Sequence, residues 1–476
     1  MKQRGLNRRQ FISMVAAGAG AACLSACSWS GQRVASNAKQ TKRPNIVFII
    51  ADDLGWADVG YHGSDIQTPN IDSLAKQSVR FEQHYVMPTC TPTRVGLMTG
   101  RFPSRYGVLS PAYGKIFDDD TVTLAEALRR SGYTTSISGK WHLGSPPDFT
   151  PRKYGFDSSY GYFDGQIDPY THHYKTGVRS WHRNDQYVDE EGHATDLITD
   201  EAVRIIESNH AGPFFLYVTY SVPHTPLDEP DKWTAPYKGR IKDASRRLYA
   251  ASVTHMDYGI GRILDALERK GLRQSTLVIF SSDNGGQKNW SSETEYEGRY
   301  AAKPHTVLGD NRPLRGWKGE VYEGGIRVPA LANWPGVLTP GSLSRPVHIV
   351  DWMPTLCTLV GCVAGALTAV QRRDALATKL KWDGKDVWPL ICGQAADAEP
   401  WPPAGEPRLL YWKTPNAFAV RHGDWKLVVG KKKKDAELYD LAADPYEKND
   451  LASQHPERVK DLRQLLATVS AQDRER

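Results

Sequence analysis

The chain has 476 residues, 40% of them hydrophobic and 10% aromatic, which is typical of a globular protein large enough for two or three domains. Its formal net charge is +6, and its first 43 residues contain no Asp or Glu. Without the four basic residues that precede Cys27 the net charge is +2, which argues against a nucleic-acid partner.

Residues 1–27 are predicted to be an export signal. Arg8 and Arg9 precede an Ala- and Gly-rich apolar run that is too short to span a bilayer, and this pattern resembles a twin-arginine signal. The box L-S-A-C at 24–27 predicts a lipid on Cys27, and an ordinary cleaved signal is the alternative. We therefore expect an exported protein, in the periplasm or at the cell surface, whose only membrane contact is that lipid. Residues 28–43 are expected to be a linker.

Four apolar runs rich in β-branched residues predict strands that are buried on both faces, at 45–53, 133–138, 214–220 and 276–282. Helical patterns lie between them, at 69–77, 124–131, 195–207 and 255–269. Alternation of strand and helix predicts an α/β fold with a doubly wound, mostly parallel sheet, in a domain from 44 to 380.

The pattern changes after about residue 350. A helix is expected near 350–360, and Cys357 and Cys362 are predicted to be buried thiols because they lie in its apolar pattern. Twin-arginine export makes structural disulfides unexpected. Short alternating runs between 408 and 440 predict antiparallel strands, and 456–466 predicts an amphipathic helix. Residues 381–476 are therefore expected to form a smaller α+β subdomain with an antiparallel sheet.

Polar residues follow the predicted strands. In doubly wound sheets, ligands bind beyond the carboxyl ends of the strands, so these residues are expected to meet there. Three carboxylates and one amide oxygen form a set that suits Ca²⁺, or Mg²⁺, and suits zinc poorly. The members of this set are Asp52, Asp53, Asp283 and Asn284. Taken singly, an Asp pair is more often a cap, and D-N-G-G more often a turn.

The stretch C-T-P-T-R at 90–94, followed by T-G-R at 99–101, resembles the C/S-x-P-x-R core of the formylglycine-dependent (type I) sulfatase family. Further stretches resemble blocks of that family in the usual order, so that the likeness covers about 44–452. They are G-K-W-H-L-G at 139–144, S-V-P-H-T-P at 221–226, S-S-D-N-G-G at 281–286, P-L-R-G-W-K-G-E-V-Y-E-G-G-I-R-V-P at 313–329 and E-L-Y-D-L-A-A-D-P-Y-E-K-N-D-L-A at 437–452.

The resemblance implies an alkaline-phosphatase-like fold and hydrolysis of sulfate esters through a covalent sulfo-enzyme. A maturase would convert Cys90 to Cα-formylglycine, whose hydrate would be both the nucleophile and a metal ligand. The four oxygen-bearing residues above would complete the shell of a metal ion, normally calcium. The remaining roles would be those of Arg94 on the hydrated aldehyde, Lys140 and Lys318 on sulfate oxygens, His142 on the second hydroxyl and His224 as general acid.

The substrate is expected to be a sulfated glycan of galactose or N-acetylgalactosamine type. Residues 154–162, 348–356 and 383–388 resemble arylsulfatase B, the N-acetylgalactosamine-4-sulfatase type, and 313–329 fits bacterial polysaccharide sulfatases. Loops around 165–190, with His172 and His173, and around 287–312 are expected to set specificity; loop packing is the alternative for the two histidines. Two other functions stay open: a phosphomonoesterase or phosphonate hydrolase of the same superfamily, and an inactive glycan-binding surface lipoprotein with an unmodified Cys90.

Overall fold

The computed structural model describes residues 43–208, 210–290, 306–362, 381–393, 407–431 and 436–475. These residues belong to one compact unit, Lys42–Arg476. The predicted signal, Cys27 and nearly all of the predicted linker lie outside the described residues. Within the described part of the chain, no helix combines the length and the apolar character that a membrane crossing requires.

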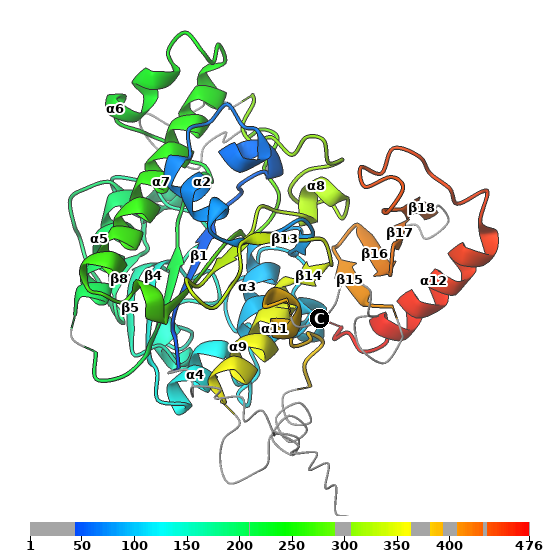
Figure 1. Ribbon diagram of the computed structural model, residues 1–476, viewed down its shortest axis with the longest axis horizontal. Coiled ribbons are helices and arrows are strands. Elements are labelled where there is room, and N and C mark those ends of the chain that lie inside the picture. Colours follow the sequence, from blue (N-terminus) through cyan, green and yellow to red (C-terminus); the bar gives the residue numbers. More distant parts are fainter. Residues whose placement is uncertain are drawn as a thin grey trace, which may run out of the picture. The chain divides into compact units, whose positions relative to one another are not determined.

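Five parallel strands form the centre of a ten-stranded sheet in the described residues (Figure 1). In spatial order they are β11 (Thr276–Ser282), β1 (Asn45–Ala51), β10 (Phe214–Thr219), β4 (Thr134–Lys140) and β5 (Ser158–Tyr162). The four strands predicted from apolar runs are therefore adjacent and parallel, as expected for strands that are covered on both faces.

Short strands extend this sheet at both edges. On the β11 side they are β12 (Leu331–Asn333), antiparallel to β11, then β2 (Val79–Phe81) and β13 (Gly341–Leu343). On the β5 side they are β8 (Trp181–Arg183), antiparallel to β5, and β9 (Gln186–Tyr187). Two small pairs complete the β-structure of this part: β3 (His84–Tyr85) with β14 (Val347–His348), and β6 (His173–Tyr174) with β7 (Val178–Arg179).

Helices cover both faces of the sheet (Figure 1). Side chains of a strand alternate between its faces, and β1 follows this rule. Val47 and Ile49 pack in one core cluster with residues of α2 (Pro69–Lys76), α5 (Ala194–Glu207) and α7 (Ala244–Arg269). Ile46 and Phe48 pack in another with residues of α3 (Cys90–Thr99), α4 (Leu124–Arg130) and α9 (Trp352–Val360). The doubly wound arrangement is thus confirmed.

A second sheet near the C-terminus is antiparallel throughout, as the sequence predicts. Its strands are β15 (Leu409–Lys413), β16 (Ala417–His422), β17 (Trp425–Gly430) and β18 (Ala436–Asp440), followed by α12 (Pro456–Ser470). Lys426 of β17 is fully buried and pairs with Glu447 and with Glu323 of α8 (Glu323–Ile326). This sheet is therefore tied to the segment that carries Lys318. Two further short helices are α6 (Asp231–Thr234) and α11 (Trp388–Ile391).

The predicted boundaries of β4 and α7 are wrong. Strand β4 continues two residues beyond 138, because Gly139, at φ +118°, lets the backbone approach β10; a Cβ there would lie 1.8 Å from the Thr219 carbonyl oxygen. Helix α7 begins at Ala244 rather than near 255. Asp243 is its N-cap, because the Asp243 side chain accepts a hydrogen bond from the Arg246 N–H.

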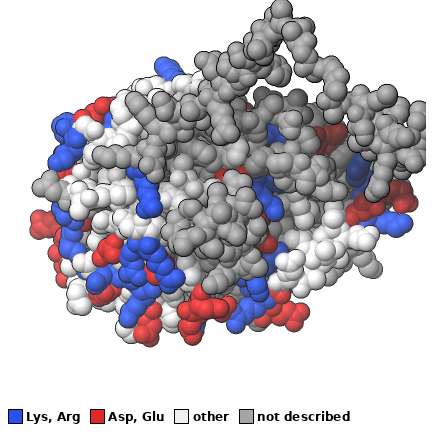
Figure 2. Space-filling view, turned by 60° about the horizontal axis from the view of Figure 1, so that its bottom comes forward, with Lys and Arg blue, Asp and Glu red and all other residues white. Residues whose placement is uncertain are grey.

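On the face shown in Figure 2, basic and acidic side chains are interspersed, without a basic stripe among the residues drawn in colour.

Candidate active site

The predicted site residues meet at the carboxyl edge of the central sheet. Asp52 and Asp53 follow β1, Lys140 ends β4 and precedes His142, and Asp283 with Asn284 follows β11. His224 follows β10, and Cys90 with Arg94 lies on α3. Lys318 comes from the loop before α8 and reaches the same place. Residues far apart in the sequence are thus brought together as the strand-end argument requires.

The acidic residues form a buried cluster. Asp52, Asp53, Asp283 and Asn284 are each at most 1% exposed. The backbone N–H of Asp53 donates to Asp283 Oδ1 at 3.2 Å, and Asn284 Nδ2 donates to Asp53 Oδ1 at 2.7 Å. Burial and the neighbouring carboxylate of Asp283 raise the pKa of Asp52 to about 8. Because these carboxylates lie close together, they repel one another when ionised, and nearby cations are needed to stabilise their charged forms.

Three basic side chains pair with these carboxylates and neutralise part of their charge. Lys140 Nζ lies 2.7 Å from Asp52 Oδ2, and both side chains are fully buried. Lys318 Nζ lies 2.7 Å from Asp53 Oδ1, and the Arg94 guanidinium lies 2.8 Å from Asp283 Oδ2. Burial alone would raise the pKa of Asp53, but the charge of Lys318 and the hydrogen bond from its Nζ lower it to about 2.

The same cluster has the donors that a hard divalent cation needs. Asp52 Oδ1 and Asn284 Oδ1 are buried and accept no hydrogen bond from the described residues. Buried oxygens without partners are costly unless a ligand contacts them. Three carboxylates with one amide oxygen match the oxygen ligands of Ca²⁺ and Mg²⁺. The residues present therefore fit such an ion.

Cys90 is the first residue of α3, and its side chain points at His142. The Sγ atom lies 3.2 Å from His142 Nδ1, and the residue is 3% exposed. Burial raises the pKa of the thiol, and the nearby Asp283 and Asp52 add to this against Lys140 and Lys318. The unmodified side chain is therefore a neutral thiol and not an activated thiolate.

His142 is held in place by its backbone and by a glycine. It adopts φ +52°, and its N–H donates to the Phe163 carbonyl at 3.0 Å. A Cβ on Gly165 would lie 2.7 Å from the imidazole, so only glycine fits against the ring. Burial and the cations Lys140 and Arg94 lower the pKa of His142 well below its ordinary value, so the ring is neutral.

His224 also faces the acidic cluster. Its Nδ1 donates to the Thr225 carbonyl oxygen, which leaves Nε2 toward Asp53 Oδ2 at 3.8 Å. Burial and Lys318 lower the pKa of His224 to about 3. The ring is therefore neutral before an anion binds, and a negative charge placed between it and Lys318 would raise its pKa.

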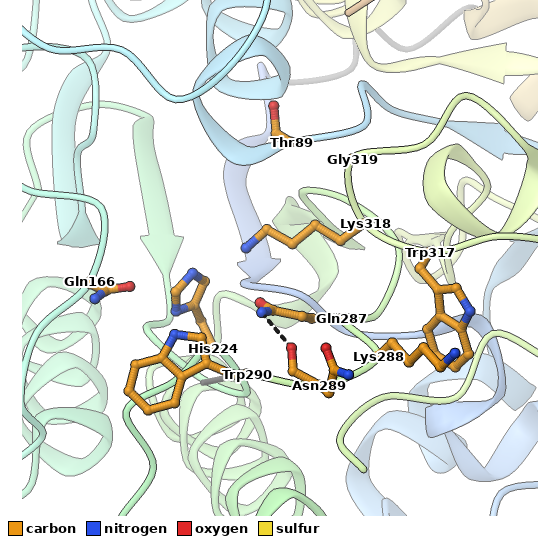
Figure 3. Close-up of a pocket in the computed structure, with 10 residues that line it drawn as sticks. All are labelled: Thr89, Gln166, His224, Gln287, Lys288, Asn289, Trp290, Trp317, Lys318 and Gly319. Carbon is orange, nitrogen blue, oxygen red and sulfur yellow. Dashed lines mark hydrogen bonds between the residues drawn. The ribbon is translucent and has the colours of Figure 1, made fainter. Parts of the chain in front are cut away.

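A cavity of about 480 Å³ opens beside His224 and Lys318 (Figure 3). Its wall includes Thr89, the residue before Cys90, and Gln166, together with residues 287–290 and 317–319. Both segments that the sequence predicts to set specificity contribute to the cavity wall, the first through Gln166 and the second through residues 287–290. Residues 291–305 of the second segment lie outside the described part of the chain. Gln166 was not predicted, because an amide in a loop follows no periodic pattern.

The loop that carries His224 is fixed at its far end by a histidine pair that the sequence also did not reveal. His255 Nδ1 lies 2.7 Å from Glu229 Oε2, and its Nε2 lies 3.1 Å from Asp196 Oδ1. His193 Nε2 lies 2.9 Å from the Asp228 carbonyl oxygen. Burial opposes a charge on His255, but Asp196 and Glu229 raise its pKa above the ordinary value.

The remaining predicted side chains are in less reactive positions. His172 is 2% exposed and stacks on Trp181 with ring centroids 4.6 Å apart, so it packs the loop. His173 is half-buried in β6. Cys357 is buried in α9, whereas Cys362 is only partly buried, and both are free thiols.

Comparisons with known proteins point to the same family that the sequence motifs resemble. The sequence model of the family described as Sulfatase matches residues 44–362. Arylsulfatase J of Mus musculus is 33% identical over 471 residues, covering 90% of this chain and 76% of that protein. N-acetylgalactosamine-6-O-sulfatase of Bacteroides thetaiotaomicron is 29% identical, covering 94% and 97%. The crystal structure of Ps i-CgsB in complex with k-i-k-neocarrahexaose has a TM-score of 0.77 at 30% identity, covering 91% and 94%.

Proposed function

Because the chain belongs to the sulfatase family and is a sulfuric ester hydrolase, we propose that it removes sulfate from a glycan with a formylglycine at position 90. The observation that carries this proposal is the convergence at one strand edge of Cys90, a buried carboxylate cluster and three buried or half-buried cations. A sulfate ester needs its charge neutralised before a nucleophile can approach sulfur.

A calcium ion held by Asp52, Asp53, Asp283 and Asn284 would act as a Lewis acid on the sulfate and on residue 90. Hydrated formylglycine at position 90 would supply a geminal diol. One hydroxyl would attack sulfur and displace the sugar alcohol, which leaves with a proton. The other hydroxyl would lose its proton to His142, so that the aldehyde re-forms and the C–O bond to the sulfate breaks.

The neutral thiol supports the need for that modification. Burial holds Cys90 in its protonated form, in which it is a poor nucleophile. His142 Nδ1 lies 3.2 Å from Cys90 Sγ, and the imidazole is neutral, so it can accept a proton from the second hydroxyl of the hydrate. Arg94, on the next turn of α3, balances the charge of Asp283 behind this residue.

Lys318 and His224 are suited to stabilise and protonate the oxygen of the alcohol that leaves. Lys318 Nζ contacts Asp53 and lines the cavity together with His224. A bound sulfate monoanion would raise the pKa of His224, so that Nε2 can carry a proton to the departing alcohol. A sugar alkoxide is a poor leaving group, and such proton donation typically contributes 10²- to 10⁴-fold.

For the substrate, we propose a galactose- or N-acetylgalactosamine-type sulfate. The support is that one relative is named an N-acetylgalactosamine-6-O-sulfatase and that a similar structure contains a neocarrahexaose.

We further propose export by the signal at 1–27 to the periplasm or cell surface, with maturation of Cys90 in the cytoplasm before folding hides 90–94. Lipid attachment at Cys27 belongs to the same proposal.

Hydrolysis assays on protein co-produced with a maturase test the proposal. Sulfate release from N-acetylgalactosamine or galactose sulfates is expected, with a higher kcat/KM for 4-nitrophenyl sulfate than for 4-nitrophenyl phosphate. Cys90→Ala is expected to abolish turnover. Faster phosphate hydrolysis would favour a phosphomonoesterase, and glycan binding without any turnover would favour a glycan-binding lipoprotein. Activity on other sulfates only would reject the galacto-type substrate.

A further inference from the structure

The cavity beside His224 lies where the alcohol part of the substrate must be. Lys318 and His224 both face the acidic cluster and both line the cavity, and Thr89 places its wall next to residue 90. If sulfate occupies the space between these groups, the ring bonded to the ester oxygen extends into the cavity. Its volume of about 480 Å³ is within the usual range of small-molecule sites, about 300–1,000 Å³.

The wall has the chemistry of a sugar-binding site. Among the described residues that line the cavity, side-chain amides and indoles are present and carboxylates are absent. Amides both donate to and accept from hydroxyl groups, and indole faces pack against the C–H face of a pyranose. Lys288 and Lys318, which line the same cavity, suit an anionic ligand. The amides are Gln166, Gln287 and Asn289, and the indoles are those of Trp290 and Trp317.

One side of the cavity is held by hydrogen bonds of its own. The Gly309 N–H donates to the Gln287 carbonyl at 2.9 Å, and the Leu308 N–H donates to the Lys288 carbonyl at 3.1 Å. Gln287 Nε2 donates to the Asn289 carbonyl at 2.8 Å (Figure 3). A wall fixed by its own hydrogen bonds loses little freedom on binding.

Gln166 faces the cavity from a different segment, apart from Lys318 and Gln287 in the view of Figure 3. Its position is tied to the reaction centre, because its neighbour Gly165 packs against the His142 ring. The amide nitrogen of Gln166 is buried and has no hydrogen-bond partner among the described residues. Turning the amide about its last bond exchanges its nitrogen and oxygen, so the side that faces the cavity can present either a donor or an acceptor to a sugar hydroxyl.

We infer that this cavity is the subsite for the pyranose ring that bears the scissile sulfate, and that Gln166 selects the sugar through a hydrogen bond to a hydroxyl group of that ring. The inference rests on the proposed function, since it assigns the substrate's own ring to the cavity. It makes Gln166 a specificity-determining residue that contacts the sugar and not the reacting atoms.

Steady-state kinetics on Gln166→Leu test the assignment. We expect kcat/KM for N-acetylgalactosamine 4-sulfate or 6-sulfate to fall roughly 10-fold, the effect of one hydrogen bond. The loss for 4-nitrophenyl sulfate, which has no ring hydroxyls, is expected to be several-fold smaller. Gln454→Leu is the matched control, because Gln454 is exposed in the turn before α12 and does not line the cavity; it should change neither value.

A binding assay separates this inference from the proposed function. Calorimetric titration of the same sugar sulfates into Cys90→Ala protein, with and without Gln166→Leu, requires no turnover. Roughly 10-fold weaker binding in the double variant supports the subsite even if the enzyme proves inactive on glycans. Equal affinity of the two proteins, or equal loss of kcat/KM on the glycan and the aryl sulfate, would overturn the assignment to Gln166.

Discussion

The buried pair of Arg94 and Asp283 gives the sharpest stability prediction. Its atoms are 2.8 Å apart and both side chains are fully buried. Arg94→Met leaves the Asp283 carboxylate uncompensated beside Asp52 and Asp53. Removing one partner of a buried pair typically costs about 3–5 kcal/mol, because the remaining charge cannot be solvated. We expect a destabilisation of this size when the measurement is made in chelator, since a divalent cation would share the charge.

Urea unfolding followed by tryptophan fluorescence measures the effect. Arg129→Met is the matched control, because Arg129 pairs with Glu126 at the surface, where its side chain is 43% exposed and such pairs contribute about 0–1 kcal/mol. A second test adds Asp283→Asn to Arg94→Met, which should recover part of the loss. An Arg94→Met protein as stable as the Arg129→Met protein in chelator would refute the electrostatic reasoning.

Three further predictions concern other parts of the site. Gly165→Ala should turn the His142 ring away from residue 90, because the new Cβ would lie 2.7 Å from it; we expect at least a 10-fold loss of kcat with a native circular dichroism spectrum, and full activity would contradict the packing. The raised pKa of His255 stabilises the fold fully below the unfolded-state pKa of about 6.5, and this contribution is lost as pH rises through the folded-state pKa. Thermal unfolding between pH 6 and 10 should show that loss, and Glu229→Gln should reduce it; identical pH profiles would count against the pair. Chelation should lower both activity and melting temperature, with recovery in Ca²⁺ and not in Zn²⁺; recovery in Zn²⁺ alone would exclude a hard oxygen site.

Four of the five central parallel strands were predictable, because strands covered on both faces are continuous apolar runs; β5 was not predicted. β1, β10 and β11 fall within one or two residues of their predicted ranges. The edge strands were not predicted, since strands of two or three residues, such as β12 and β9, are too short to show alternation. β4 was predicted too short because a glycine at positive φ interrupts the pattern without ending the pairing.

The site could be predicted as a set of residues but not as a set of contacts. Strand ends place Asp52, Lys140 and Asp283 at one edge, and a parallel sheet brings them together. Which cation pairs with which carboxylate depends on side-chain directions in a three-dimensional arrangement. The partner of His255 and the position of Gln166 depend on loops, whose paths have no periodic signal in the sequence.

Mass spectrometry of the peptide that contains residues 90–94, from protein produced in a host with a formylglycine-generating maturase, tests whether residue 90 is the modified nucleophile. We expect an aldehyde at position 90 that reacts with a hydrazide probe, in proportion to the sulfatase activity of the preparation. Full sulfatase activity in protein whose Cys90 is entirely a free thiol would contradict a formylglycine mechanism.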